Sequence, residues 1–270
     1  MSFYRSSAAQ SPLRYDTVPA LELSRVSHQF GKFEALSDIS LRVEAGERVA
    51  LVGSSGAGKS TLLRLMNGTL MPASGEIWVL GQRLDRLSHK RLRGVQQQMG
   101  TIYQQFHLIN SLRVVHNVNA GHLGRWPFWK AAASLLYPLD VKIAARALEQ
   151  VGIPEKLFAR TDQLSGGEQQ RVALARVLVQ NPALILADEP IASLDPELSR
   201  SMMNLLRDLT TELGKTLIVS LHSVEFARSH CDRLIGLRQG QILFDAPATQ
   251  VSDDMLEALY QRDVPARSQS

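Results

Sequence analysis

Apolar and polar positions alternate in two stretches near the beginning of the chain. From Leu21 to Val26 and from Leu36 to Val43 the apolar residues recur with a period close to two, which predicts antiparallel strands. A short apolar strand is expected over 47–52, and it ends at the glycine-rich segment 53–58. Apolar residues then recur at helical spacing over 60–67. The sequence therefore predicts a strand, a glycine loop and a helix in succession.

The middle of the chain has a different character. From 111 to 162 it is rich in Ala, Leu and Arg and interrupted by prolines, which predicts an inserted helical subdomain over about 111–164. Helices and apolar strands alternate again after it: we expect a helix over 167–180, a strand over 183–187, a helix over 196–213 and a strand over 216–221. Apolar strands separated by helices predict an α/β fold with a parallel sheet covered on both faces.

Length and hydropathy suggest how these elements are organised. The 270 residues, 44% of them hydrophobic, are enough for one large domain, and we expect it over 21–260 with a flexible arm over 1–20 and a tail over 261–270. The first 20 residues lack the apolar core of a signal peptide, so export is not expected. No apolar run approaches the ~18–20 residues that cross a bilayer. A role at a membrane would therefore require docking onto another protein.

Charge and cysteine content add little beyond this. The chain has 30 Lys and Arg against 26 Asp and Glu, a net charge of +4 without a long basic tract, so nucleic-acid binding gains no support. The single cysteine, Cys231, cannot form an intramolecular disulfide and is expected to be a small packed residue. This usage fits a reducing compartment.

The glycine loop carries the first chemical motif. Its pattern, G-x-x-x-x-G-K-[ST], is formed by Gly53, Ser54, Ser55, Gly56, Ala57, Gly58, Lys59 and Ser60. Glycines let consecutive backbone N–H groups point at phosphate oxygens, and the following helix N-terminus adds its partial positive charge. We expect Lys59 to reach the β- and γ-phosphates, Ser60 to bind Mg²⁺, and Thr61 to bond a phosphate nearer the nucleoside. A chance glycine turn is disfavoured, because pattern and predicted context agree.

Two adjacent carboxylates, Asp188 and Glu189, follow the apolar strand predicted over 183–187. The carboxyl ends of strands in open α/β sheets are where ligands bind. One acidic group is needed to hold the hydrated Mg²⁺, and we assign Asp188 to the metal; the other orients and activates the attacking water, and we assign it to Glu189. In isolation the pair could equally be an exposed strand end or a helix cap.

The segment Leu164–Arg171 reads Leu-Ser-Gly-Gly-Glu-Gln-Gln-Arg. A hydroxyl and unhindered N–H groups at a helix start make Ser165, Gly166 and Gly167 a second anion site, and they also cap the helix. The segment closely resembles the signature sequence of ABC ATPases. The resemblance implies a P-loop NTPase fold of the ABC type, with an antiparallel β subdomain and an inserted helical subdomain. It also implies a head-to-tail homodimer, in which the signature of one copy closes over the γ-phosphate of ATP held by the other.

Further residues take roles from this resemblance. Phe30, before Gly31, resembles the aromatic on which adenine stacks, although a lone Phe is more often core. Gln104 resembles the glutamine that touches Mg²⁺ and water and senses the membrane partner; the register could slip by one to Gln105. His222, after the strand over 216–221, resembles the histidine that contacts the γ-phosphate.

The loop 193–196 reads Ser-Leu-Asp-Pro and resembles the segment that passes signals between paired subunits, with Asp195 close to the shared nucleotide site. An Asp-Pro turn leading into a helix is the plain structural reading of the same residues. The two readings are compatible.

The resemblance extends over nearly 21–260 and sharpens in four segments: 121–129, 187–196, 219–227 and 233–240. These are similar to the ATP-binding subunit of bacterial phosphonate importers. The similarity implies ATP hydrolysis coupled to uptake of phosphonates, or of related oxyanions such as phosphite. It also implies integral membrane permease subunits, a separate periplasmic solute-binding protein, and a peripheral place on the cytoplasmic face of the inner membrane.

Alternatives remain open at this level. A soluble ABC ATPase, for example an accessory protein of carbon–phosphorus bond cleavage, would carry the same motifs. A plain P-loop kinase is disfavoured, because the segment Leu164–Arg171 would then have no purpose. The aromatic residues Trp126, Phe128 and Trp129 either line a groove that receives a short helix of the permease or pack in the core of the helical subdomain.

Overall fold

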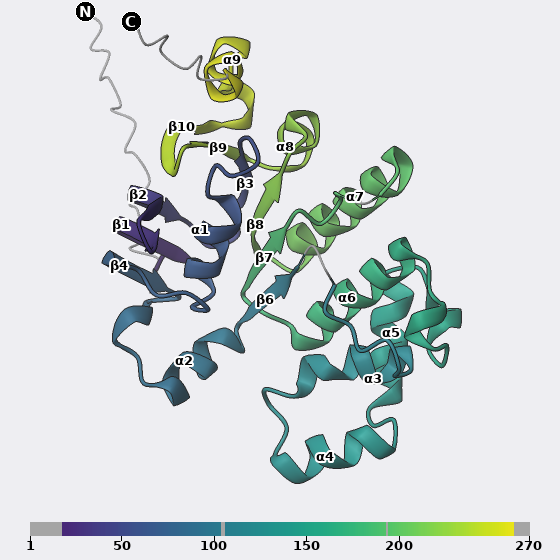
Figure 1. Ribbon diagram of the computed structural model, residues 1–270. Coiled ribbons are helices and arrows are strands. Elements are labelled where there is room, and N and C mark those ends of the chain that lie inside the picture. Colours follow the sequence, from purple (N-terminus) through teal and green to yellow (C-terminus); the bar gives the residue numbers. More distant parts are fainter. Residues whose placement is uncertain (1–17, 104–105, 193, 262–270) are drawn as a thin grey trace, which may run out of the picture.

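Two sheets form the body of the protein in the computed structural model, which describes residues 18–103, 106–192 and 194–261 (Figure 1). The first is antiparallel and has four strands in the order β2-β1-β4-β5. Its strands are β1 Leu21–Phe30, β2 Phe33–Val43, β4 Ser74–Val79 and β5 Gln82–Arg83. The prediction of antiparallel strands in this part of the chain is confirmed.

The second sheet has six strands in the order β10-β9-β3-β8-β7-β6. They are β3 Arg48–Val52, β6 Met99–Ile102, β7 Leu184–Asp188, β8 Thr216–Leu221, β9 Arg233–Arg238 and β10 Gln241–Pro247. Neighbouring strands from β9 to β6 are parallel, and β10 closes one edge in the antiparallel sense. The predicted parallel sheet is therefore present.

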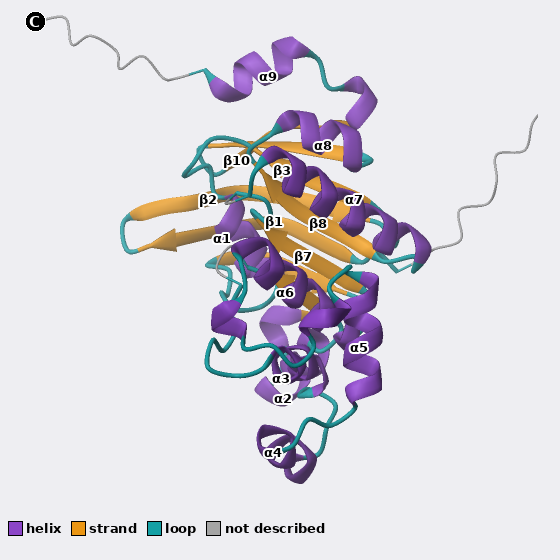
Figure 2. Cartoon of the chain, turned by 90° about the vertical axis from the view of Figure 1, so that its right-hand side faces the viewer, coloured by secondary structure: helices purple, strands orange, loops and turns teal. Residues whose placement is uncertain are grey.

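This sheet separates two hydrophobic cores, and β3 shows how. Val49 and Leu51 pack into one core with β1, β2, β4 and α1 (Lys59–Met66), while Ala50 and Val52 pack into the other. Successive side chains of a strand point to opposite faces, so an uninterrupted apolar strand supplies both cores. The second core is built with α6 (Gly166–Gln180), α7 (Pro196–Glu212) and α8 (Val224–His230), which lie over the sheet in Figure 2.

Three helices lie between β6 and α6: α3 Val114–Asn119, α4 Phe128–Leu136 and α5 Val141–Gln150. Pro127 precedes α4, Pro138 follows it, and Pro154 begins a 3-10 turn after α5. Proline cannot donate a backbone hydrogen bond, so each one lies at an element boundary. α3 and α5 pack against α6, and α4 projects at the end of the molecule opposite α9 (Figures 1 and 2).

The remaining elements are α2 His89–Gln96, α9 Asp253–Tyr260 and the 3-10 turns Leu84–Arg86, Ala120–His122, Pro154–Lys156, Thr161–Gln163 and Ala248–Gln250. Among the described residues, no helix combines the length and apolar character needed to cross a membrane. Residues 1–17 and 262–270 lie outside the described part, so the arm and the tail stay predictions.

Candidate active site

The parallel register brings three predicted segments to one edge of the sheet. Val52, the last residue of β3, pairs with Leu221, and Asp188 at the end of β7 pairs with Ser220. The glycine loop leaves β3, the acidic pair leaves β7, and His222 follows β8. All three therefore meet at the carboxyl edge of the sheet, where α/β sheets bind ligands.

Glycine is required at two positions of the loop. Gly53 has φ +150°, and a Cβ there would lie 2.2 Å from the carbonyl oxygen of Leu237. Gly58, which caps α1, has φ +106°, and a Cβ would lie 2.7 Å from Leu36 Cδ2. Any larger residue would force the loop away from β9 and β2. The glycines thus let the backbone pass between these strands and enter the helix.

Lys59 is held inside the loop. Its side chain is 4% exposed, and Nζ donates to the carbonyl oxygens of Gly53 at 2.8 Å and Ser54 at 3.0 Å. Burial lowers the pKa of Lys59, against the opposing effect of the carboxylates of Glu189 and Asp188. A buried ammonium of this kind gains stability from an anion placed in the loop.

Asp188 is the centre of a small hydroxyl network. Ser60 Oγ donates to Asp188 Oδ1 at 3.0 Å, and Ser220 Oγ donates to the same oxygen at 2.8 Å. The backbone N–H of Glu189 donates to Ser220 Oγ at 2.8 Å. Ser220 is fully buried and was not among the predicted site residues. The one available signal was a hydroxyl near the carboxyl end of a strand that is apolar from Leu217 to Val219.

Glu189 and His222 face each other. Glu189 Oε1 lies 2.6 Å from His222 Nε2, and the carboxylate is mostly buried while the imidazole is half-exposed. The backbone of Glu189 has φ +48°, a left-handed conformation that costs a non-glycine residue free energy. Strain of this kind persists where the surroundings hold a side chain in place, and here the Ser220 bond to the Glu189 N–H supplies part of that hold.

These groups open onto a pocket of about 420 Å³. It is lined by Phe30, Phe33, Ala35, Ser55, Gly56, Gly58, Lys59, Ser60, Thr61, Glu189 and His222. Of the other loop residues, Gly53 and Ser54 bind Lys59 through their carbonyl oxygens, and Ala57 is buried. The pocket thus joins two aromatic rings to the glycine loop and the carboxylate.

The two rings come from one hairpin. Phe30 ends β1 and Phe33 begins β2, and they pair across the turn. Both side chains are solvent-accessible, at 47% and 65% exposure, which is unusual for phenylalanine. Phe30 is therefore not a residue of the hydrophobic core. Phe33 was missed in the sequence, although it stands three residues after Phe30.

The signature turn lies elsewhere on the surface. Ser165 caps α6 with a reciprocal capping box: its N–H donates to Glu168 Oε2 at 2.8 Å, and the Glu168 N–H donates to Ser165 Oγ at 3.3 Å. Ser165 and Gly166 are exposed and, like Gly167, are not among the residues lining the pocket of the same chain. A Cβ on Gly166 would meet open space.

Asp195 caps α7 and accepts from the N–H groups of Glu197 and Leu198 at 3.0 and 2.9 Å. It too is not among the lining residues of the pocket. Gln104, Gln105 and Ser193 lie outside the described residues, so the expectations on them stay predictions.

The aromatic residues of the helical subdomain bear on one of the two expectations. Trp126 is partly buried and stacks on His122, with 5.1 Å between ring centroids. Phe128 and Trp129 are 88% and 71% exposed, so neither packs in a core. Neither is among the lining residues of the pockets between α2, the turn Ala120–His122 and α6, and the groove reading stays a prediction.

Comparison with known proteins adds a family. A family model described as ABC transporter matches residues 36–192. The phosphonates import ATP-binding protein PhnC of Pseudomonas fluorescens (strain Pf0-1) is 46% identical over 233 residues, 86% of this chain and 88% of the relative. PhnC 2 of Pseudomonas aeruginosa (strain UCBPP-PA14) is 48% identical over 226 residues, 84% and 85% of the two chains.

Solved structures agree with these relatives. The dimeric structure of a bacterial ABC transporter cassette superposes with a TM-score of 0.73 at 30% identity, covering 84% of this chain and 98% of the other. A dimeric cassette in a post-hydrolysis state, bound to ADP and Pi, matches with the same TM-score and identity. With its phosphate loop, acidic pair and signature turn, the chain belongs to the ATP-binding proteins of the ABC transporter family.

Proposed function

We propose that this chain is the ATP-hydrolysing subunit of an importer for phosphonates, or for related phosphorus oxyanions such as phosphite. The observation that carries the proposal is the convergence of Lys59, Asp188, Glu189 and His222 at one sheet edge, beside an aromatic pair. The transported solute is inferred from the two Pseudomonas relatives at 46% and 48% identity, which are phosphonates import ATP-binding proteins.

In this proposal the pocket binds ATP end to end. The adenine stacks on the rings of Phe30 and Phe33, and the phosphates are bound by N–H groups of the glycine loop and by Lys59. The hydroxyl of Ser60 and the carboxylate of Asp188 share a hydrogen bond of 3.0 Å and are hard oxygen ligands, which suit Mg²⁺; Gln104 is the further ligand proposed. When bound, Mg²⁺ supplies charge neutralisation of the β- and γ-phosphate oxygens.

Glu189 acts as the general base. Its Oε1 takes the proton of the attacking water, whose oxygen then bonds to the γ-phosphorus as the bond to the β-phosphate oxygen breaks. His222, 2.6 Å from that carboxylate, holds it in place and contacts the γ-phosphate. Lys59 stabilises the charge on the phosphate oxygens.

The complete site needs a second copy of the chain. Ser165, Gly166 and Gly167 lie at an exposed helix start and are not among the residues that line their own chain's pocket, so we assign them to the γ-phosphate held by the partner copy. Asp195, at the start of α7, would lie near the same boundary. Support comes from the dimeric form of the related cassettes.

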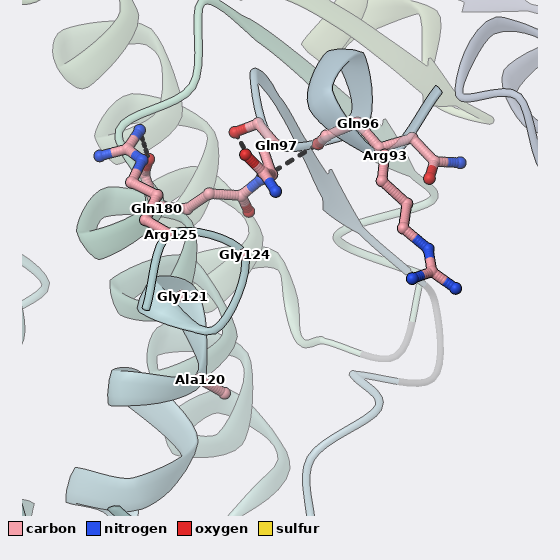
Figure 3. A pocket seen from close by; sticks show the side chains of 8 residues that line it. All are labelled: Arg93, Gln96, Gln97, Ala120, Gly121, Gly124, Arg125 and Gln180. Atoms are coloured by element: carbon pink, nitrogen blue, oxygen red, sulfur yellow. Dashed lines mark hydrogen bonds between the residues drawn. The ribbon is translucent and has the colours of Figure 1, made fainter. Parts of the chain in front are cut away.

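The permease is proposed to dock in two adjoining pockets between α2, the turn Ala120–His122 and α6. The first is lined by Arg93, Gln96, Gln97, Ala120, Gly121, Gly124, Arg125 and Gln180 (Figure 3). Its floor is stiffened by Gln180 Nε2, which donates to the carbonyl oxygen of Met99 at 2.7 Å. Docking there would hold the subunit peripherally on the cytoplasmic face of the inner membrane, while a periplasmic solute-binding protein delivers the solute.

The test is reconstitution. The chain should co-purify with a polytopic permease from detergent-solubilised membranes, and vesicles containing the complex should hydrolyse ATP faster when a solute-binding protein loaded with methylphosphonate is supplied. Sulfate in place of methylphosphonate is the matched control. Failure of any polytopic membrane protein to co-purify with the chain, together with no response of its ATPase to the loaded solute-binding protein, would favour the soluble accessory protein instead.

A further inference from the structure

Carboxylates are missing from a long stretch of the chain. Asp and Glu make up 26 of its 270 residues, yet none stands between Asp85 and Asp140. The same stretch holds seven cationic residues: Arg86, Lys90, Arg91, Arg93, Arg113, Arg125 and Lys130. The net charge of +4 therefore conceals a strong local excess of positive charge.

Helices α2 and α4 both belong to this stretch: α4 projects at the end of the molecule opposite α9 (Figures 1 and 2), and α2 lies in the same half of the molecule, where Arg93 and Gln97 share a pocket with Gly124 and Arg125 just before α4. On α2, Lys90, Arg91 and Arg93 are exposed. Within the described residues no carboxylate lies within ion-pairing distance of them; the nearest ion pairs along the chain belong to Arg83 and Lys130. α2 thus presents unneutralised cations to its surroundings.

On α4 the exposed groups are aromatic. Phe128 and Trp129 form its first turn and are 88% and 71% exposed. The preceding segment is well anchored, because Trp126 stacks on His122 and carries the ammonium of Lys130 4.6 Å above its ring centre. Neither exposed ring is among the lining residues of the pockets beside α2 and α6, and α4 projects from the body of the molecule (Figures 1 and 2).

A projecting helix with exposed aromatic rings, in a part of the chain with an excess of cations, suits a deformable partner better than a folded protein surface, which would have to supply a matching cavity. Trp, Phe and Lys without acidic residues are typical of segments that lie in the headgroup region of a membrane. The inner leaflet is anionic, so it also complements the charge of α2.

We propose that the α2 and α4 end of this chain binds anionic lipid headgroups, with Lys90 and Arg91 supplying electrostatic attraction and Phe128 and Trp129 entering the interface. The inference rests on the proposed function, because docking on a permease brings the chain to the bilayer. The contact adds a second attachment to that docking and orients the helical subdomain against the membrane.

Vesicle sedimentation with the purified full chain tests the proposed binding to anionic lipids. The wild type should bind vesicles of phosphatidylcholine with about 30 mol% phosphatidylglycerol and not vesicles of phosphatidylcholine alone, and binding should weaken from about 50 to 300 mM salt. The K90Q/R91Q variant should lose affinity on the order of 20-fold, since each cation near such a surface contributes about fivefold. The F128A/W129A variant should also bind more weakly.

Two controls match these changes. R200Q/K215Q removes the same charge from α7 and from the residue before β8, and F158A removes another exposed aromatic ring; both should bind like the wild type. Thermal melting should show that every variant remains folded. Equal binding of all variants, or no preference for phosphatidylglycerol, would overturn the proposal.

A loss of permease co-purification in K90Q/R91Q or F128A/W129A with unchanged vesicle binding would also overturn it, because this surface would then be a protein contact. ATP hydrolysis by the isolated chain separates this outcome from the proposed function. A chain that binds vesicles but does not hydrolyse ATP would contradict the proposed function and leave the lipid contact standing.

Discussion

Replacing Ser220 by Ala tests whether the hydroxyl network behind the acidic pair positions the chemistry. The Ser220 hydroxyl donates to Asp188 Oδ1 and accepts from the Glu189 N–H, both at 2.8 Å, and the side chain is fully buried. The variant removes a charge-assisted bond and leaves a backbone donor unsatisfied. It also removes the hydrogen bond that helps to keep the backbone of Glu189 in its left-handed conformation.

The size of the effect follows from these two bonds. A hydrogen bond to a charged group contributes about 1.5–3 kcal/mol, and an unsatisfied buried donor costs about 1–3 kcal/mol. Because the two losses overlap, we expect the free energy of unfolding of S220A to fall by about 2–4 kcal/mol. A general base contributes about 10²–10⁴-fold to rate, so its partial misplacement should lower kcat for ATP hydrolysis by at least about tenfold.

Urea unfolding and steady-state ATPase assays measure both quantities. The matched control is S199A: Ser199 is buried as well, but its hydroxyl makes only a 3.5 Å contact to the Leu194 carbonyl oxygen. It should change the unfolding free energy by less than about 1 kcal/mol and leave kcat near the wild-type value. If S220A matched S199A in both assays, the network would have no positioning role.

Four other changes follow from the same site. E189Q should lower kcat by about 10²–10⁴-fold and leave ATP binding, measured by calorimetry, unchanged; normal turnover would exclude Glu189 as the base. F30A/F33A should weaken ATP and GTP binding alike, by about 1–3 kcal/mol per lost stacking ring, and an effect on ATP alone would contradict simple stacking. G53A should fail to bind ATP, because its Cβ would collide with the β9 backbone; wild-type affinity would show that the loop can move. Burial lowers the pKa of Lys59, so its ammonium is lost below the ordinary value of 10.5, and ATP affinity should fall as pH rises towards that value; in K59R this fall should be absent.

Most of the fold could be predicted from local sequence patterns. Largely apolar strands such as β8, which has the predicted bounds Thr216–Leu221, can be predicted because burial on both faces requires mostly apolar side chains. The glycine loop was equally legible, since its chemistry needs fixed residue types at fixed spacing. The edge strand β10 alternates exposed and half-buried residues, and only the β9 pairing identifies its place.

The sequence did not show which residues, distant along the chain, lie close together in space. Ser220 became a site residue only when the register set it beside Asp188, 32 positions away. Phe33 likewise joined Phe30 through the hairpin turn. Phe128 and Trp129 could have been core or groove residues, because a pair of aromatics on a nine-residue helix does not reveal what the helix packs against. In each case the missing information was tertiary contact.

The most direct test of the account is whether two copies share each ATP site. K59A disables the phosphate loop, and G166D places a carboxylate at the signature turn where a Cβ meets open space, so its fold should be unaffected. Each variant alone should be inactive. Mixed in equal amounts, they should recover about a quarter of wild-type ATPase, because half the dimers pair the variants and each of these has one intact site. A mixture no more active than its components would contradict the composite site.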